Sequence, residues 1–220
     1  MKQIFVYGDS LSWGFIPGTR QRLPFAQRWP GVLEIQLNAA GQGVRIIEDC
    51  LNGRRTVLED PIKAGRNGLA GIGQRMEVNS PLALAILMLG INDFQSMYTF
   101  TAWHSAQGIA GIVRAMRAAP IEPGMPVPPI LIVSPPPITT LAGDSVIKYA
   151  GAEKKCAGLA GALRAVAETE GCSFFDAGSV ARLSAIDGIH LDADQQEILG
   201  RALTGKVTEI LSQNAASAQI

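Results

Sequence analysis

The sequence predicts an α/β fold, and three observations lead to this class. Five short apolar runs rich in Val, Ile and Phe alternate with longer stretches of helical spacing. Hydrophobic residues make up 47% of the chain and charged residues 17%, a balance typical of a globular protein with a buried sheet. The length of 220 residues fits one domain. We therefore expect a single domain over residues 1–211 and a small, polar tail, residues 212–220, that frays.

The apolar runs and the helical patterns give the order of the elements. The expected strands are Gln3–Tyr7, Val44–Glu48, Leu84–Leu89, Ile130–Val133 and Ser173–Phe175. The expected helices are Trp29–Ala39, Ala102–Ala118, Ala152–Glu170 and Ala193–Leu211, with a weaker pattern, interrupted by glycines, over Gly65–Val78. Strands that alternate with helices form parallel sheets covered on both faces. The predicted architecture is a three-layer α/β/α sandwich with a flavodoxin-like, five-stranded parallel sheet.

Charge and hydropathy restrict the partners. Nineteen basic residues balance nineteen acidic ones, so the chain has no general attraction to nucleic acid or to anionic membranes. The longest apolar run, Leu82–Ile91, is about half the roughly 20 residues that a membrane-spanning helix needs. Met1 and Lys2 lead directly into the first strand without an apolar stretch of signal-peptide length. We expect a cytoplasmic protein that binds neither nucleic acid nor membrane.

A serine follows the first strand at the edge where α/β sheets bind ligands, the carboxyl ends of the strands. Gly8-Asp9-Ser10-Leu11 places Ser10 in a turn before a short helix, whose backbone N–H groups would face an anion formed beside the serine. A serine hydroxyl is a weak nucleophile and needs a histidine base, itself held by a third group. Ser10 is therefore the candidate nucleophile.

The chain has two histidines. His104 lies near the start of an expected helix, where a surface or capping role is the simpler interpretation. His190 ends the sequence Asp187-Gly188-Ile189-His190, and the glycine allows this loop to turn the carboxylate toward the imidazole. Asp187 and His190 are the candidate orienting acid and base; without Ser10, a turn and a helix entry would explain them equally well.

Stabilisation of a tetrahedral oxyanion requires further hydrogen-bond donors. Removal of one such donor from an enzyme raises the activation free energy by about 3 kcal/mol. The Gly53 N–H after the second strand and the Asn92 side-chain amide after the third are candidates, together with the Ser10 N–H. Each could also be an ordinary glycine-containing turn. Arg54 and Arg55, next to Gly53, are expected to be solvated or to form salt bridges.

These blocks resemble the SGNH or GDSL serine hydrolases, whose four signature positions correspond to Ser10, Gly53, Asn92 and His190. Further segments are similar to a bacterial arylesterase and acyltransferase subgroup that includes mycobacterial acyltransferases. These segments are Trp13-Gly14, Val133–Pro137 and Phe174–Val180. The resemblance implies a serine esterase of the arylesterase type that acts on short acyl or aryl esters through an acyl-enzyme at Ser10. It also implies that no metal or other cofactor is used and that the protein forms a homo-oligomer.

The resemblance leaves the acceptor open, since water would give hydrolysis whereas an alcohol or peroxide would give acyl transfer or perhydrolysis. Trp13 and Phe94 are the expected substrate-binding aromatics, with Phe15 and Trp29 as further candidates for an apolar pocket. A carbohydrate deacetylase with the same triad is one alternative, and a non-catalytic domain that binds acylated ligands is another. Metal hydrolysis through Asp9, Asp93, Asp187 and His190 is disfavoured because these residues lack a compact ligand motif.

Overall fold

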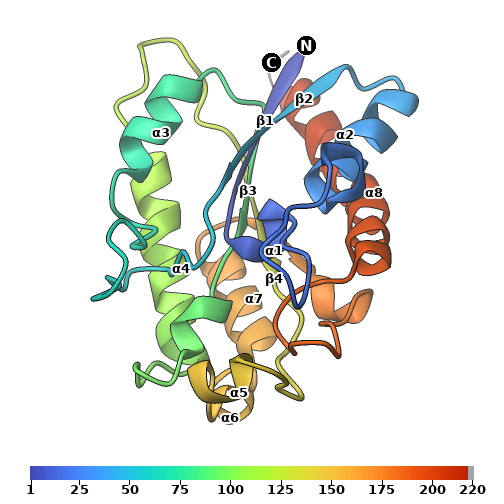
Figure 1. Ribbon diagram of the computed structural model, residues 1–220. Coiled ribbons are helices and arrows are strands. Elements are labelled where there is room, and N and C mark those ends of the chain that lie inside the picture. Colours follow the sequence, from blue (N-terminus) through green and yellow to red (C-terminus); the bar gives the residue numbers. More distant parts are fainter. Residues whose placement is uncertain (218–220) are drawn as a thin grey trace.

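The computed structural model describes residues 1–217 of the chain. Its centre is a parallel sheet with the strand order β2-β1-β3-β4-β5, which runs through the middle of Figure 1. The strands are β1 (Lys2–Gly8), β2 (Val44–Cys50), β3 (Leu84–Met88), β4 (Ile130–Ser134) and β5 (Ser173–Asp176). The five predicted strands are confirmed, each with ends within two residues of those predicted.

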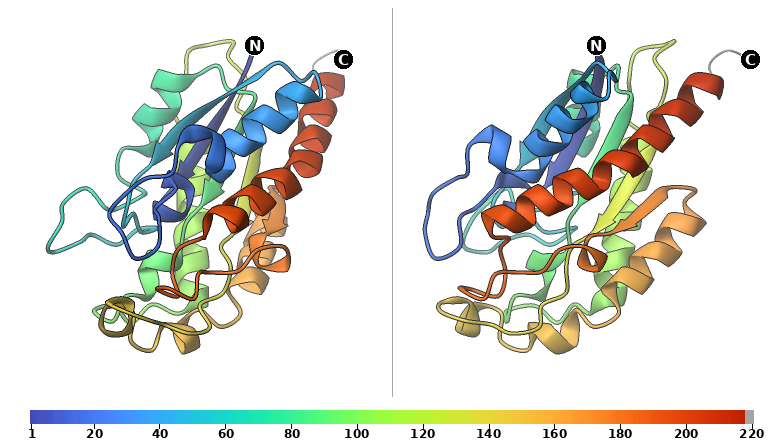
Figure 2. Two further views of the ribbon diagram at one scale, coloured as in Figure 1. Left: turned by 45° about the vertical axis from the view of Figure 1, so that its right-hand side comes forward. Right: turned by 90° about the vertical axis from the view of Figure 1, so that its right-hand side faces the viewer.

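Helices cover both faces of the sheet, as Figures 1 and 2 show. Helices α2 (Trp29–Ala39) and α8 (Ala193–Ser217) pack together on one face. Helices α3 (Ile72–Asn79), α4 (Ala102–Arg117) and α7 (Leu159–Thr169) lie on the other. The expected three-layer sandwich is confirmed.

The burial pattern explains why these segments adopt their structures. All five residues of β3, Leu84–Met88, are buried, as expected of a central strand with helices on both sides. In α4, Ile109, Ile112, Val113 and Met116 are buried at a spacing of three and four residues, so they form the stripe that faces the core. A hydrophobic core cluster extends from Ile4 to Leu211.

The pairing register brings three loops to the same edge of the sheet. Gly8, the last residue of β1, pairs with Cys50 of β2 and with Met88 of β3. The segments that follow these three residues contain Ser10, Gly53 and Asn92. Short helices occupy several connections: α1 (Ser10–Trp13), α5 (Ser145–Lys148), α6 (Ala152–Lys155), η1 (Phe25–Gln27), η2 (Ile91–Phe94) and η3 (Ala177–Ser179).

The predicted helix Ala152–Glu170 is wrong as one element. The structure divides it into α6 and α7, and Gly158, which precedes α7, has a φ of 81°. A left-handed residue cannot continue a right-handed helix. The alanine-rich composition of this stretch hid the break.

The weaker prediction over Gly65–Val78 is correct only in its second half. Gly71 has a φ of 75°, and α3 begins after it. At the carboxyl end, α8 continues through residues 212–217, and residues 218–220 lie outside the described residues. The fraying expected from residue 212 stays a prediction. Within residues 1–217, no helix is both long and apolar enough to cross a membrane.

Candidate active site

Ser10 is the first residue of α1 and lies directly after β1. The Asp9 side chain caps this helix, since its Oδ1 accepts the Leu11 N–H at 2.9 Å. A Cβ atom on Gly8 would lie 2.4 Å from Ser12 Oγ, so the glycine is required for close packing of this turn. The turn and the cap therefore fix where the Ser10 hydroxyl lies.

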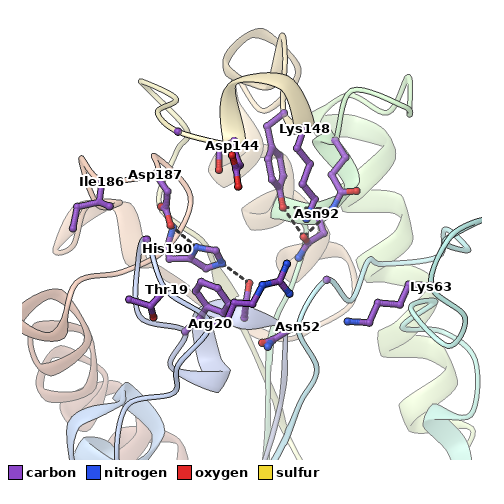
Figure 3. Close-up of a pocket in the computed structure, with 18 of the residues that line it drawn as sticks. Thr19, Arg20, Asn52, Lys63, Asn92, Asp144, Lys148, Ile186, Asp187 and His190 are labelled. Atoms are coloured by element: carbon purple, nitrogen blue, oxygen red, sulfur yellow. Dashed lines mark hydrogen bonds and ion pairs between the residues drawn. The ribbon is translucent and has the colours of Figure 1, made fainter.

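His190 connects Ser10 to Asp187 in a chain of hydrogen bonds (Figure 3). His190 Nε2 lies 3.1 Å from Ser10 Oγ, and His190 Nδ1 lies 2.7 Å from Asp187 Oδ2. The other carboxylate oxygen, Oδ1, accepts the backbone N–H groups of Ile189 and His190, each at 2.9 Å. The Phe15 ring stacks on the imidazole with the ring centroids 4.2 Å apart. The arrangement can remove the Ser10 proton through His190.

The surroundings keep the Asp187 carboxyl ionised. Partial burial raises the pKa of this carboxyl, but hydrogen bonds from the His190 side chain and backbone outweigh it and lower the pKa to about 2. Gly188, with a φ of 75°, makes the loop possible, because a Cβ there would lie 2.0 Å from the Thr140 carbonyl oxygen. The carboxylate can therefore balance the charge of a protonated His190.

Gly53 and Asn92 are the two further candidate oxyanion donors, and they follow β2 and β3. Gly53 has a φ of 80° in the turn after β2, and Asn92 is buried in η2 after β3. Both residues line the same cleft as Ser10. The Asn92 Nδ2 group donates to Asp9 Oδ2 at 3.1 Å and to the Arg54 carbonyl at 3.2 Å. These are long hydrogen bonds, and a stronger acceptor such as an oxyanion could draw on the same N–H groups.

Two residues that sequence analysis missed hold the Asn92 amide. The Tyr149 hydroxyl donates to Asn92 Oδ1 at 2.7 Å, and Gln95 Nε2 donates to the same oxygen at 3.2 Å. With its oxygen occupied in this way, the Asn92 side chain presents its NH₂ group toward Asp9. Gln95 lies three residues beyond Asn92, which could have been noticed, but Tyr149 follows 57 residues later and no local pattern marks it.

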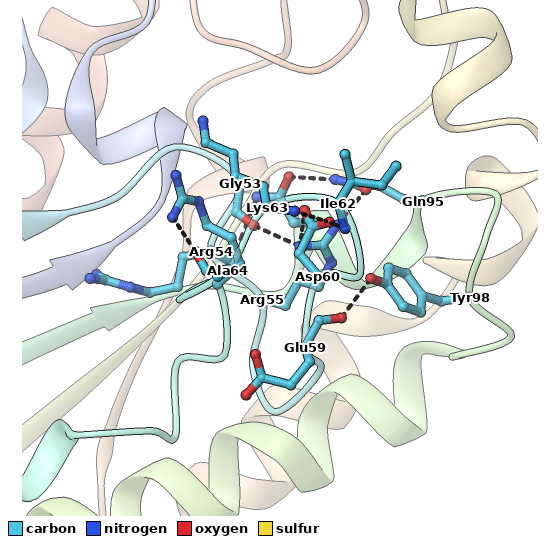
Figure 4. Close-up of polar contacts among 12 residues, drawn as sticks. Gly53, Arg54, Arg55, Glu59, Asp60, Ile62, Lys63, Ala64, Gln95 and Tyr98 are labelled. Carbon is cyan, nitrogen blue, oxygen red and sulfur yellow. Dashed lines mark hydrogen bonds and ion pairs between the residues drawn. The ribbon is translucent and has the colours of Figure 1, made fainter.

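Arg54 and Arg55 are buried and are not solvated. Arg54 bonds to Asp49 at 2.6 Å and stacks over Tyr7, with its guanidinium carbon 4.0 Å from the ring centroid. Arg55 donates to the Gly53 carbonyl at 3.2 Å, to Asp60 at 2.9 Å and to Gln95 Oε1 at 2.6 Å (Figure 4). The salt-bridge interpretation is confirmed, and Arg55 connects the Gly53 turn to the residue that holds Asn92.

Burial changes the protonation of Asp9. Its carboxyl is 1% exposed, and this desolvation raises its pKa from 3.8 to about 7 despite hydrogen bonds from Leu11 and Asn92. The Asp9 carboxyl therefore titrates near neutral pH beside a candidate oxyanion donor.

The site opens into a cleft of about 800 Å³. Its walls include Ser10, Phe15, Gly53, Asn92, Asp187 and His190. The expectation for Phe94 is wrong: its side chain is 0% exposed and borders a separate cavity of about 220 Å³ next to Pro135–Pro137. Trp13 does not line the cleft either, since it packs beside Phe15 under the Arg22 guanidinium. Of the four aromatic residues expected at the substrate, Phe15 lines the cleft, whereas Trp29 is buried in the core.

His104 lies outside this site. It is exposed at the start of α4, where its Nδ1 accepts the Thr101 N–H at 3.2 Å. The capping interpretation is confirmed. Among the described residues, no three side chains of His, Cys, Asp or Glu form a group that could hold a metal ion.

Comparison with known proteins gives consistent results. The family model described as "GDSL-like Lipase/Acylhydrolase family" matches residues 6–198. An arylesterase of Vibrio mimicus is 32% identical over 92 residues; this match spans 42% of the chain and only 38% of that relative's length.

Several solved structures match over 96% of this chain and 100% of their own length. A carbohydrate acetylesterase family member from Sinorhizobium meliloti has 37% identity and a TM-score of 0.90. The M. smegmatis aryl esterase has 33% identity and a TM-score of 0.89. The chain therefore belongs to the GDSL-like lipase/acylhydrolase family, a family of carboxylic ester hydrolases.

Proposed function

We propose that this protein is a serine esterase that hydrolyses short-chain acyl or aryl esters through an acyl-enzyme at Ser10. The observation that carries the proposal is the hydrogen-bonded series from Ser10 through His190 to Asp187, with separations of 3.1 and 2.7 Å, in the wall of an open cleft. Residues 1–211 act in this proposal as one catalytic domain.

The first step forms the acyl-enzyme. His190 Nε2 accepts the Ser10 proton while Ser10 Oγ attacks the ester carbonyl carbon. The backbone N–H groups of Ser10 and Gly53 and the Asn92 amide donate to the oxyanion that develops. As the tetrahedral intermediate collapses, the C–O bond to the alcohol breaks and His190 returns the proton to the departing oxygen.

The second step releases the acyl group. His190 takes a proton from water, the resulting hydroxide attacks the acyl carbonyl, and Ser10 leaves as its proton returns. An alcohol in place of water would give acyl transfer, and a peroxide would give perhydrolysis. The ratio of transfer to hydrolysis in water–alcohol mixtures would measure the preferred acceptor.

The test compares p-nitrophenyl esters of increasing acyl length with the wild type and Ser10→Ala, each with and without EDTA. The proposal expects fast, EDTA-insensitive hydrolysis of acetate or butyrate that Ser10→Ala abolishes. Activity that survives Ser10→Ala or disappears with EDTA would contradict the serine mechanism.

A carbohydrate deacetylase is the second candidate. The likeness to the Sinorhizobium meliloti carbohydrate acetylesterase favours it, as does a cleft of about 800 Å³, which can admit more than a small aryl ester. Acetate release from acetylated sugars, compared with phenyl acetate in kcat/KM, separates the two. A domain that only binds acylated ligands would retain them without turnover.

We also propose that the protein forms a homo-oligomer. Ile62, Ile147 and Ile186 are 84%, 83% and 59% exposed, and Ile186 lines the cleft. Ile62 and Ile147 each precede a residue that lines the cleft, Lys63 and Lys148. Exposed apolar side chains are suited to burial in a protein contact. Sedimentation velocity would test the oligomeric state. The cytoplasmic location stays a prediction, and cell fractionation would test it.

A further inference from the structure

Basic side chains are concentrated in the cleft beside Ser10. Four of its lining residues are Arg20, Lys63, Arg66 and Lys148, although the chain as a whole has no net charge. Among the described residues, none of the four forms an ion pair within 4.0 Å. The cleft therefore has positive charge that the protein itself does not neutralise.

The carboxylates of the cleft do not supply the missing partners. Asp60 is paired with the buried Arg55 at 2.9 Å, and Asp187 is paired with His190 at 2.7 Å. Asp144 is the remaining acidic residue of the lining and is exposed before α5. One free carboxylate thus faces four cations.

The cations also influence one another. Partial burial lowers the pKa of Lys148, and the charges of Arg55, Lys63 and Arg20 lower it further, opposed by Asp60. Arg20 and Lys63 extend into the cleft from opposite walls in Figure 3. Cations held together in a concave site attract an anion to the space between them.

The four basic side chains differ in how many of their N–H groups are free to bind an anion. Arg66 donates to the carbonyls of Asn52 and Ala64, both at 2.9 Å, so its guanidinium is held by the backbone. No hydrogen bond of the described residues uses the ammonium of Lys63, and Lys148 only lies over the Tyr149 ring at 5.4 Å. These two lysines are available for a ligand.

Their position relative to His190 indicates which part of an ester they would meet. The departing alcohol must lie next to His190, which protonates it. Lys63 lies across the cleft from His190, beyond Asn52, in Figure 3. A group that reaches Lys63 would thus belong to the acyl part of the ester.

We propose, on the basis of the proposed esterase function, that the preferred substrates are half-esters of short dicarboxylic acids, whose free carboxylate binds Lys63 and Lys148. Arg20 adds to the positive field between the two walls. The lysines are specificity-determining residues in this assignment, and the bond-breaking steps at Ser10 stay the same.

The test uses a charged and a neutral ester with one leaving group. The ratio of kcat/KM for 4-nitrophenyl hemisuccinate to that for 4-nitrophenyl butyrate is measured, with Ser10→Ala as the blank for spontaneous hydrolysis. Lys63→Gln and Lys148→Gln should each lower the ratio by about three- to fivefold, as expected for partly exposed ion pairs. Raising the ionic strength to about 1 M should lower the wild-type ratio as well.

The controls separate this inference from the proposed function. Lys154→Gln changes an exposed lysine of α6 that does not line the cleft and should leave the ratio unchanged. A ratio that is insensitive to both cleft lysines, while butyrate is hydrolysed, would overturn the inference alone. In a second pair, 4-acetoxybenzoate carries a carboxylate on the alcohol side and phenyl acetate is its neutral counterpart. Lysine dependence confined to this pair would overturn the acyl-side assignment. If the wild type hydrolysed none of these esters, the proposed function itself would be overturned.

Discussion

Replacing Asp187 by asparagine tests the role of this carboxylate with a change of only one atom. The two backbone N–H groups of Ile189 and His190 donate to Asp187 Oδ1 at 2.9 Å each. In Asp187→Asn the amide oxygen must occupy this position, because an NH₂ group there would face two donors. The amide NH₂ then takes the place of Oδ2, 2.7 Å from His190 Nδ1.

This orientation imposes the wrong tautomer on His190. An NH₂ group facing Nδ1 requires Nδ1 to accept, so the ring proton moves to Nε2, which faces Ser10 Oγ at 3.1 Å. A protonated Nε2 cannot accept the Ser10 proton. The same change in a serine protease triad costs about 10⁴-fold in kcat. We expect a loss of roughly 10³- to 10⁴-fold here, which corresponds to about 4 to 5.5 kcal/mol of activation free energy.

The assay is steady-state hydrolysis of p-nitrophenyl acetate at pH 7.5, with kcat and KM determined separately. The loss should fall on kcat and leave KM within about threefold, because both carboxylate oxygens of Asp187 are used by hydrogen bonds to Ile189 and His190 and not for binding substrate. Thermal unfolding of the variant controls for folding. A loss in kcat of less than tenfold, in a variant that unfolds at the wild-type temperature, would refute the tautomer argument.

Three further predictions concern residues around the triad. Tyr149→Phe removes the 2.7 Å donor to Asn92 Oδ1 and, as Tyr149 positions that amide, should lower kcat about tenfold with little change in KM, measured with the same ester. The pKa of Asp9 is about 7 in the folded state and about 3.8 in the unfolded state, so between these pH values the folded state binds one more proton. The free energy of unfolding therefore falls as the pH rises from about 4 to 7, by at most on the order of 4 kcal/mol. Urea unfolding at pH 5 and pH 8 should show a smaller decrease in Asp9→Asn than in the wild type; equal decreases would contradict the assignment. Gly188→Ala forces a Cβ to within 2.0 Å of the Thr140 carbonyl oxygen at a φ of 75°, and should lower the free energy of unfolding by at least about 2 kcal/mol in the same assay.

The strands and the order of the site residues could be predicted because both depend on local pattern. A run such as Leu84–Met88 is buried on both faces, so its composition alone marks it as a strand. Parallel strands then bring the residues after each run to one edge, so Ser10, Gly53 and Asn92 could be predicted to share one site. The geometry of this edge follows from topology and needs no knowledge of side-chain packing.

The errors concern side-chain direction and long-range contacts. Phe94 comes directly after Asn92 and Asp93, but its ring turns into a separate cavity, away from the cleft. In the 3-10 turn η2, neighbouring side chains point in different directions, so closeness in sequence does not place them in one site. Tyr149 reaches Asn92 from a loop 57 residues away, and a contact of this kind depends on how that loop packs.

A single buried cation connects the two candidate oxyanion donors that come from different strands. The Arg55 guanidinium contacts the Gly53 carbonyl and Gln95 Oε1, and Gln95 in turn donates to Asn92 Oδ1. The Arg55 side chain is 1% exposed and also pairs with Asp60 at 2.9 Å, so its own position is fixed. The separation of these two donors is therefore set by Arg55 as well as by the register of β1 with β2 and β3.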